Sequence, residues 1–535
     1  MGGLDRTDDD VESVVVDSGH TSTSNVDGEL NSVTDVFTAS YYGDLAKLRD
    51  FVEDQGLSVM SPDMNGNYPL QWASLNEFPS IVQFLIDKGA DVNTEDNMKQ
   101  TALHWAAVRG SISAADVLLR NGARINASDI HGFKAVHTAA QFGKTTFLNH
   151  IIKNYGADFD VLDNRGRTPL HWAAYKGCAD TVRLLLFRGA NQGKQDIEGF
   201  TPLHWIVLKD NTEAGAILAY AGTIEELLIK DHSGFTPYQL ASSRGHRRLS
   251  FLISGAIMRK GNQWHHKIWR MGFAPVLLFV IISYSILFIK FVIAGSNFPK
   301  ITAVVGLWGW IAVSFAFGSV FMLYRCSSKD PGFVKSHSSY NLTDVEDMPL
   351  TIDLNSSIYT GNWSQLCPTC KIIRPLRSKH CPSCNHCVEQ FDHHCPWISN
   401  CVGKRNKWDF FLLIWMGTLT SSISAIVTLH RLWTINSQPS DESWIYHLIT
   451  EYSGAVFFLL IDSFLVFGMI ILTRSQSYQI SQNITTNESS NAHRYNYLQG
   501  QGGQFRNPYN HGIKKNCSNF FIYGYTSDEE VRAFS

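Results

Sequence analysis

The chain has 535 residues and a formal net charge of −3, with 44% hydrophobic, 12% aromatic and 17% charged residues. This length allows several domains. The near-neutral charge gives no electrostatic reason to expect a nucleic-acid partner, whereas the low charge and high aromatic content suit a chain that lies partly in lipid. The start of the chain lacks the basic region and apolar core of a secretory signal peptide, so none is expected.

Residues 1–33 are rich in Asp, Ser, Thr and Gly and carry only scattered apolar residues. Such a segment cannot bury enough apolar surface to offset the entropy lost on ordering it. We therefore expect a disordered acidic leader.

A short phrase then recurs through residues 34–255. It begins as Y-P-L-Q-W-A at Tyr68 and returns at steps of 33, 33, 34, 33 and 35 residues as T-A-L-H-W-A, K-A-V-H-T-A, T-P-L-H-W-A, T-P-L-H-W and T-P-Y-Q-L. This period and phrase resemble the ankyrin repeat, and the resemblance implies stacked pairs of antiparallel helices. A degenerate copy near Val36 to Gly56 would cap the stack and bring it to about seven repeats.

One histidine and one tryptophan recur at fixed places in the phrase. Because the histidine recurs once per repeat at the same position in four of the six phrases, we interpret the histidines as hydrogen-bonding groups of the repeat turn, not as metal ligands. The tryptophans are interpreted as part of the core between repeats. The histidines are His104, His137, His171 and His204, and the tryptophans are Trp72, Trp105, Trp172 and Trp205.

Four apolar runs follow, at 271–295, 301–324, 410–429 and 452–473. Each is long enough for a helix to cross a hydrocarbon core of about 30 Å. Lys and Arg concentrate before the first run, between the second and third, and after the fourth, which predicts that the repeats, the 325–409 loop and both termini face the cytosol. Asp462, inside the fourth run, is interpreted as a polar contact between helices, with a functional role as the alternative.

Seven of the ten cysteines lie in the loop between the second and third runs, among four histidines. Close-set Cys and His donors are typical of tetrahedral zinc sites, and disulfides are not expected in a segment that faces the reducing cytosol. Two four-ligand sites need eight donors, which six cysteines and two histidines supply, so that one cysteine is left over. Spacing alone leaves open which donors share a metal. The cysteines are Cys367, Cys370, Cys381, Cys384, Cys387, Cys395 and Cys401.

The spacing of this window resembles the DHHC cysteine-rich domain of protein S-acyltransferases, placed at about 365–410. With the repeats, the whole chain is similar to the plant tip-growth-defective type of ankyrin-repeat S-acyltransferase. The resemblance implies that Asp392, His393, His394 and Cys395 form the signature motif, with Cys395 outside both metal sites. It implies one zinc site of Cys367, Cys370, His380 and Cys387, and a second of Cys381, Cys384, His394 and Cys401.

Short motifs elsewhere occupy the places where this family carries supporting residues. From Ser475 onward the composition predicts disorder, but the resemblance implies that Asn516 ties the tail to the membrane domain as its C-terminal asparagine motif. Trp105 and Asn76 are expected to contact substrate peptides, as the ankyrin domain does in related animal enzymes. Cys326 and Cys517 are interpreted as ordinary thiols, with acylation as the alternative. The supporting residues are Asp330, Pro331 and Gly332 of a DPG motif, and Thr485, Thr486 and Glu488 of a TTxE motif.

The expected activity is transfer of palmitoyl from palmitoyl-CoA to cysteine thiols of substrate proteins through an acyl-enzyme on Cys395. A free thiol with a pKa of about 8.5 needs activation near neutral pH. His393 is therefore expected to act as the base and Asp392 to fix its tautomer and orientation. Both zinc ions are expected to be structural, because four protein ligands fill each site.

The sequence therefore predicts an all-α fold: a cytosolic ankyrin-repeat solenoid, then a four-helix polytopic membrane domain with a cytosolic zinc-binding DHHC domain and a C-terminal tail over 474–535. The expected partners are substrate proteins with accessible cysteines, long-chain acyl-CoA and the lipid bilayer. The expected location is an endomembrane, with the Golgi as the family expectation. The alternative is a non-enzymatic membrane scaffold, which has no use for an unligated Cys395. An ankyrin-bearing ion channel is disfavoured because four spans do not make a six-span pore.

Overall fold

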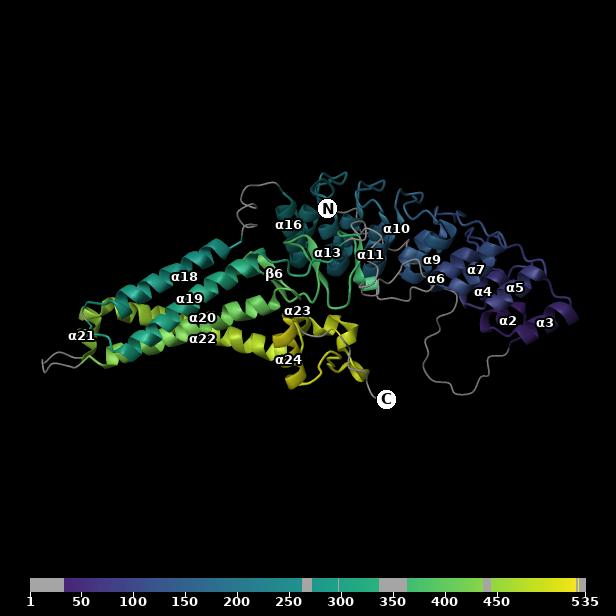
Figure 1. Ribbon diagram of the computed structural model, residues 1–535. Coiled ribbons are helices and arrows are strands. Elements are labelled where there is room, and N and C mark those ends of the chain that lie inside the picture. Colours follow the sequence, from purple (N-terminus) through teal and green to yellow (C-terminus); the bar gives the residue numbers. More distant parts are fainter. Residues whose placement is uncertain are drawn as a thin grey trace, which may run out of the picture. The chain divides into compact units, whose positions relative to one another are not determined.

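The computed structural model describes residues 33–261, 272–296, 298–335, 363–435, 444–525 and 528 (Figure 1). The predicted leader, residues 1–33, lies outside this part of the chain except for its last residue. Within the described residues helices predominate, in agreement with the predicted all-α class, and the strands lie between Leu366 and Val402. The chain divides into two compact units, residues 1–130 and 131–535.

The described part of the first unit consists of short helices in antiparallel pairs. The phrase residue that precedes each first helix of a repeat is extended, and a side chain of the helix bonds back to it. In the second repeat the backbone N–H of Thr101 donates to Nδ1 of His104 at 3.1 Å. The helices are α2 (Val36–Tyr42), α3 (Leu45–Arg49), α4 (Pro69–Leu75), α5 (Pro79–Asp87), α6 (Ala102–Arg109) and α7 (Ile112–Arg120), with a π-turn, η1 (Asp50–Asp54), after α3.

The second unit begins with the remaining repeats. Nδ1 of His171 accepts the N–H of Thr168 at 3.0 Å, and its Nε2 lies 3.2 Å from the carbonyl oxygen of Phe200 in the next repeat. The repeat histidines therefore have the structural role that their spacing predicted. The helices are α8 (Ala135–Gln141), α9 (Thr145–Tyr155), α10 (Pro169–Lys176), α11 (Ala179–Arg188), α12 (Pro202–Lys209), α13 (Thr212–Ala221), α14 (Ile224–Leu227), α15 (Pro237–Ser243) and α16 (Arg247–Lys260).

In the part of the chain that the structure describes, four helices are long and apolar enough to cross a membrane. Three pairs of them pack side by side, α18 with α19, α19 with α20, and α20 with α22 (Figure 1). The buried face of α19 carries small residues (Gly309, Ala312, Ala316 and Ser319), which allow close helix approach. The helices are α18 (Ala274–Phe288) with its π-turn η2 (Ile289–Ile293), α19 (Ala303–Ser328), α20 (Lys407–Trp433) and α22 (Ser453–Ser481), and a shorter helix, α21 (Trp444–Glu451), precedes α22.

The cysteine-rich segment forms three small antiparallel hairpins between α19 and α20. They pair β1 (Leu366–Cys367) with β2 (Ile372–Ile373), β3 (Lys379–Cys381) with β4 (His386–Val388), and β5 (His393–Cys395) with β6 (Asn400–Val402). Two 3₁₀ turns, η4 (Trp363–Gln365) and η5 (Pro396–Ile398), complete the described part of the segment.

The tail after α22 is ordered through residue 525, so the disorder predicted from its composition is wrong there. Its asparagines are used as hydrogen-bonding groups: Nδ2 of Asn507 donates to the carbonyl of Gln482 at 2.6 Å, and Nδ2 of Asn483 to that of Tyr509 at 2.8 Å. The elements are α23 (Thr486–Ser490), the 3₁₀ turns η6 (Ala492–Arg494), η7 (Asn496–Leu498) and η8 (Gln501–Gly503), and α24 (Ile513–Tyr523), which packs on α22.

Candidate active site and metal centres

The first metal cluster is built across the first two hairpins. His380 on β3 lies directly opposite Cys387 on β4, and Cys367 on β1 joins them with Cys370 from the following turn. Nδ1 of His380 lies 3.6, 3.3 and 3.8 Å from the sulfurs of Cys367, Cys370 and Cys387. Tetrahedral zinc with bonds of about 2.0–2.3 Å separates its donors by about 3.3–3.8 Å, so these four residues fit the ion.

The second cluster repeats this arrangement one hairpin further along. His394 on β5 lies directly opposite Cys401 on β6, while Cys381 and Cys384 come from the β3–β4 hairpin. The sulfur of Cys384 lies 3.5 Å from Nδ1 of His394 and 3.3 Å from the sulfur of Cys401. In each cluster all four donor atoms lie within 4.8 Å of one another. The structure thus brings together the two ligand sets that the family resemblance implied, interleaved along the chain.

Cys395 belongs to neither cluster. It ends β5, is 7% exposed, and lies opposite Asn400, whose Nδ2 donates to the carbonyls of Cys326 at 3.0 Å and Lys329 at 2.9 Å near the end of α19. The hairpin is therefore tied to the membrane helices. Cys395 shares a buried apolar cluster with residues of α19 and α20, among them Met322, Leu323, Phe410, Phe411, Leu413 and Ile414. The sulfur thus lies where a polar reaction centre meets an apolar helical bundle.

Asp392 and His393 stand next to this thiol. Oδ2 of Asp392 accepts Nδ1–H of His393 at 2.8 Å, and the same oxygen accepts the hydroxyl of Thr486 at 2.6 Å. Oδ1 of Asp392 accepts one hydrogen bond from Nζ of Lys407 at 2.9 Å and another from the backbone N–H of Thr486 at 3.0 Å. The predicted acid–histidine–cysteine series is therefore adjacent in space, and Lys407 is a contact that the sequence did not reveal.

The charges of this group favour an ion pair between imidazole and thiol. Burial alone would raise the pKa of Asp392, but Lys407, His393 and Thr486 outweigh it and hold that pKa below its usual range. Burial lowers the pKa of His393, whereas hydrogen bonds with Asp392 and Cys395 raise it, with a net result of about 9. Burial raises the pKa of the Cys395 thiol, but the hydrogen bond and charge of His393 have a larger effect in the opposite direction. The pKa of Cys395 is therefore lower than its ordinary value. A thiolate beside an imidazolium is the reactive form of a cysteine nucleophile.

The TTxE residues connect the tail to the zinc-binding hairpins. Thr485 caps α23. Glu488 forms a bidentate ion pair with Arg377, with N–O distances of 2.7 and 2.9 Å, and both side chains are 1% exposed. The Arg377 guanidinium also stacks 4.5 Å from the ring centre of Tyr509. Glu488, through Arg377, and Thr486, through Asp392, thus hold the loops on either side of the β3–β4 hairpin against the tail.

The DPG residues and Asn516 make comparable links. Oδ1 of Asp330 accepts the N–H groups of Gly332 at 2.8 Å and Phe333 at 2.7 Å, and Gly332 has a φ of +108°, which favours glycine. The side chain of Asn516 in α24 donates to the carbonyl of Ser481 at 2.8 Å, at the end of α22. The bonds of Asp330 thus shape the turn that follows α19, and the bond of Asn516 fixes α24 to the end of α22.

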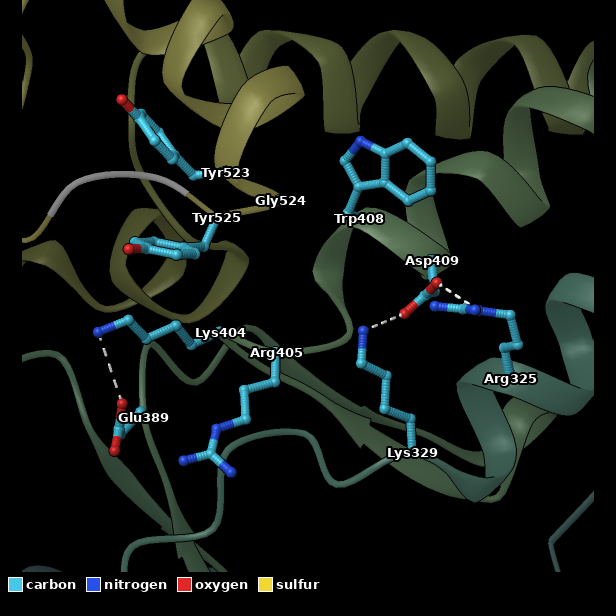
Figure 2. Close-up of a pocket in the computed structure, with 10 residues that line it drawn as sticks. All are labelled: Arg325, Lys329, Glu389, Lys404, Arg405, Trp408, Asp409, Tyr523, Gly524 and Tyr525. Atoms are coloured by element: carbon cyan, nitrogen blue, oxygen red, sulfur yellow. Dashed lines mark hydrogen bonds and ion pairs between the residues drawn. The ribbon is translucent and has the colours of Figure 1, made fainter.

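A cavity of about 490 Å³ lies beside the end of α19, where the zinc-binding segment and the tail meet (Figure 2). Its cations have acidic partners: Asp409 accepts from Arg325 at 2.9 Å and Lys329 at 2.7 Å, Lys404 lies 3.6 Å from Glu389 and Arg405 lies 3.1 Å from Asp330. No residue of the DHHC motif lines it. The cavity is therefore separate from the reacting groups. Its lining residues are Arg325, Lys329, Glu389, Lys404, Arg405, Trp408, Asp409, Tyr523, Gly524 and Tyr525.

The remaining residues singled out from the sequence lie in helices or directly beside them. In the first unit the ring of Trp105 packs edge-to-face on that of Trp72, with the ring centres 5.0 Å apart, and Asn76 directly follows α4. Oδ1 of Asp462 accepts the hydroxyl of Tyr284 at 2.8 Å, a polar contact between α22 and α18. Cys326 is fully buried, and Cys517 is partly buried against the same apolar cluster as Cys395.

Comparisons with known proteins agree with this geometry. A family model described as DHHC palmitoyltransferase matches residues 361–493, and one described as ankyrin repeats (3 copies) matches 36–129 and 130–196. "Probable protein S-acyltransferase 23" of Arabidopsis thaliana is 54% identical over 511 residues, covering 94% of this chain and 95% of that protein. "Palmitoyltransferase ZDHHC17" of Danio rerio is 30% identical over 219 residues, covering 39% of this chain and 34% of that protein. "Palmitoyltransferase ZDHHC17" of Homo sapiens is 29% identical over 237 residues, covering 40% of this chain and 35% of that protein.

The predicted fold class, with ankyrin repeats, membrane helices and a cysteine-rich DHHC region, is thereby confirmed, as is the predicted class of enzyme. The chain is an ankyrin-repeat membrane protein of the DHHC palmitoyltransferase family, and its activity is protein S-palmitoylation.

Proposed function

We propose that this enzyme transfers palmitoyl from palmitoyl-CoA to cysteine thiols of proteins through a thioester on Cys395. The single observation that carries the proposal is the position of that thiol. It stays outside both metal clusters, is buried against apolar residues of the membrane helices, and stands beside His393, which Asp392 holds through Nδ1.

The reaction proceeds in two exchanges at one carbonyl carbon. The Cys395 thiolate attacks the thioester of palmitoyl-CoA, a new carbon–sulfur bond forms, and the CoA sulfur leaves with the proton held by His393. A substrate thiol then attacks the acyl-enzyme and gives its proton to His393, and Cys395 leaves as a thiolate. Each exchange makes one thioester and breaks one, so the enzyme's contribution is to rate and not to equilibrium.

The apolar surroundings of Cys395 suit a long acyl chain. Burial of a sixteen-carbon chain stabilises it by about 12 kcal/mol, at about 0.8 kcal/mol per methylene. The two zinc ions would hold the hairpins in shape, because each four-residue cluster fills a tetrahedral ion and leaves no position for water. Asp392, His393 and Cys395 then carry the chemistry.

The ankyrin repeats are proposed to recruit substrate proteins, with Trp105 and Asn76 among the contacts. The Lys and Arg distribution supports a cytosolic position for the repeats, the zinc-binding hairpins and both termini. An endomembrane such as the Golgi is the proposed location. If recruitment is correct, Trp105→Ala and Asn76→Ala should slow acylation of a docked substrate while self-acylation of the enzyme stays unchanged.

The test of the thioester uses detergent-purified full-length protein and labelled palmitoyl-CoA. The wild type should acquire a label that hydroxylamine removes, and Cys395→Ser should not. Cys326→Ser and Cys517→Ser are matched controls that should still label. Equal labelling of Cys395→Ser, or no hydroxylamine-sensitive label on the wild type, would refute the thioester mechanism on Cys395.

A further inference from the structure

Lys407 is a buried cation in contact with the DHHC motif. It is the first residue of α20, its side chain is 3% exposed, and its Nζ lies 2.9 Å from Oδ1 of Asp392, which is itself fully buried. Taking an ammonium group out of water is costly unless a charged partner compensates. The burial of Lys407 is therefore explained by its pairing with Asp392.

Its neighbours in sequence have a different environment. Lys404 pairs with Asp528 at 3.0 Å and Arg405 with Asp330 at 3.1 Å, and the side chain of Arg405 is 54% exposed. Both line the cavity of Figure 2, where they are drawn with their charged ends away from Asp409. A cation that served only to orient the helix across a membrane would resemble these two. Lys407 instead lies inside, against the motif.

The contacts of Asp392 show what the ammonium group does there. A carboxylate has about four lone-pair positions, and four donors occupy them: Lys407 and the Thr486 N–H on Oδ1, and His393 and the Thr486 hydroxyl on Oδ2. Because Lys407 and Thr486 fix the carboxylate plane, Oδ2 is presented to Nδ1 of His393. The second ring nitrogen is then left for Cys395.

We propose that Lys407 is a positioning residue for acyl transfer, which acts through Asp392 to hold the His393 ring in line with the Cys395 sulfur. This inference rests on the proposed function. It adds to the reaction a residue of the third membrane helix, so that the orientation of the histidine depends on how α20 begins.

The experiment measures two quantities in the full-length protein: the rate of acyl-enzyme formation at saturating labelled palmitoyl-CoA, and the palmitoyl-CoA concentration that gives half that rate. Lys407→Met should lower the saturating rate by about 10- to 100-fold, by analogy with the loss seen when a group that orients a metal-binding side chain is removed. The half-saturating concentration should stay within about threefold, since orientation and not binding is lost.

Further variants separate positioning from folding. Lys407→Arg keeps the charged donor and should restore most of the rate, and Lys407→Gln keeps a neutral donor and should give an intermediate rate. Arg405→Met, two residues away, should behave as the wild type. All four should retain two zinc ions per chain.

The outcomes distinguish this inference from the proposed function. A wild type without hydroxylamine-sensitive label removes the proposed function itself. A labelled wild type with an equally fast Lys407→Met overturns only the role of Lys407. That role is also overturned if rate and zinc content fall together in Lys407→Met, Lys407→Gln and Lys407→Arg, because the lysine would then be needed for folding alone.

Discussion

Replacing Arg377 by methionine should destabilise the zinc-binding segment strongly. Arg377 donates two hydrogen bonds to Glu488 and two to Asn483, and it has 1% of its side chain exposed. Its loss leaves the Glu488 carboxylate buried without its cation. Removing one partner of such a pair costs about 3–5 kcal/mol. A destabilisation of 1 kcal/mol shifts the midpoint of unfolding by about 2–4 °C in a domain of 150–250 residues and by less in a larger unit such as 131–535, so the midpoint should fall by several degrees and by at most about 20 °C.

The assay is thermal release of zinc from the detergent-purified protein to a chromogenic chelator, which reports on the hairpins and not on the ankyrin repeats. The matched control is Arg405→Met, which breaks the exposed pair with Asp330 and should cost about 0–1 kcal/mol. The double variant Arg377→Met, Glu488→Leu removes both charges and should recover a large part of the loss. A midpoint for Arg377→Met equal to that of Arg405→Met would contradict the reasoning.

The same pair predicts a pH dependence. Burial would raise the pKa of Glu488, but the charge and hydrogen bonds of Arg377 lower it to below its ordinary value of 4.5. The stabilisation from this carboxylate is thus complete above about pH 4.5 and is lost as the pH falls through the lower folded-state pKa. Glu488→Gln should therefore be less stable than the wild type at neutral pH. The difference between their unfolding midpoints should shrink on acidification, and a constant difference would refute the assignment.

Three further predictions concern metal, membrane and tail. Cys381→Ser should lose zinc and folded structure together, whereas Cys395→Ser should keep two zinc ions per chain. Metal analysis and circular dichroism measure the two properties. Equal zinc content in the two variants would be inconsistent with the two clusters. Tyr284→Phe removes the hydrogen bond to the buried Asp462 and should lower the free energy of unfolding by about 1–3 kcal/mol. The double variant Tyr284→Phe, Asp462→Leu should recover much of that stability in a thermal unfolding assay. An unchanged stability of the single variant would contradict the contact. Asn516→Ala should make the tail more sensitive to limited proteolysis than the wild type, and an unchanged digestion pattern would exclude its anchoring role.

Much of the architecture could be predicted because it is encoded locally. The 33-residue period and the apolar runs are repeated signals within one stretch of chain, and the structure contains the corresponding repeats and long helices. The donors for two metal ions could also be counted from the sequence. Their pairing could not, because His380 opposite Cys387 and His394 opposite Cys401 depend on hairpin register, and only the family resemblance supplied it.

The contacts that organise the reacting groups were not predictable in this way. Arg377 and Glu488 are 111 residues apart, and Asp392 and Thr486 are 94 apart, so no local pattern relates them. Lys407 counted only as one more positive charge before a membrane helix. The tail was misjudged because composition treats asparagine as a solvent-exposed residue, whereas here asparagine amides satisfy backbone carbonyls at the end of α22.

The segments that meet at Asp392 are synthesised at very different times. A nascent chain carries the entire DHHC motif as soon as residue 395 has been added, but Thr486, which supplies two of the four donors to Asp392, follows only after two more membrane helices. An incomplete chain or one cleaved after α22 would thus retain the motif and both metal clusters, yet leave this carboxylate half coordinated. Biosynthesis in this order delays assembly of the reacting centre until the whole membrane domain has been inserted.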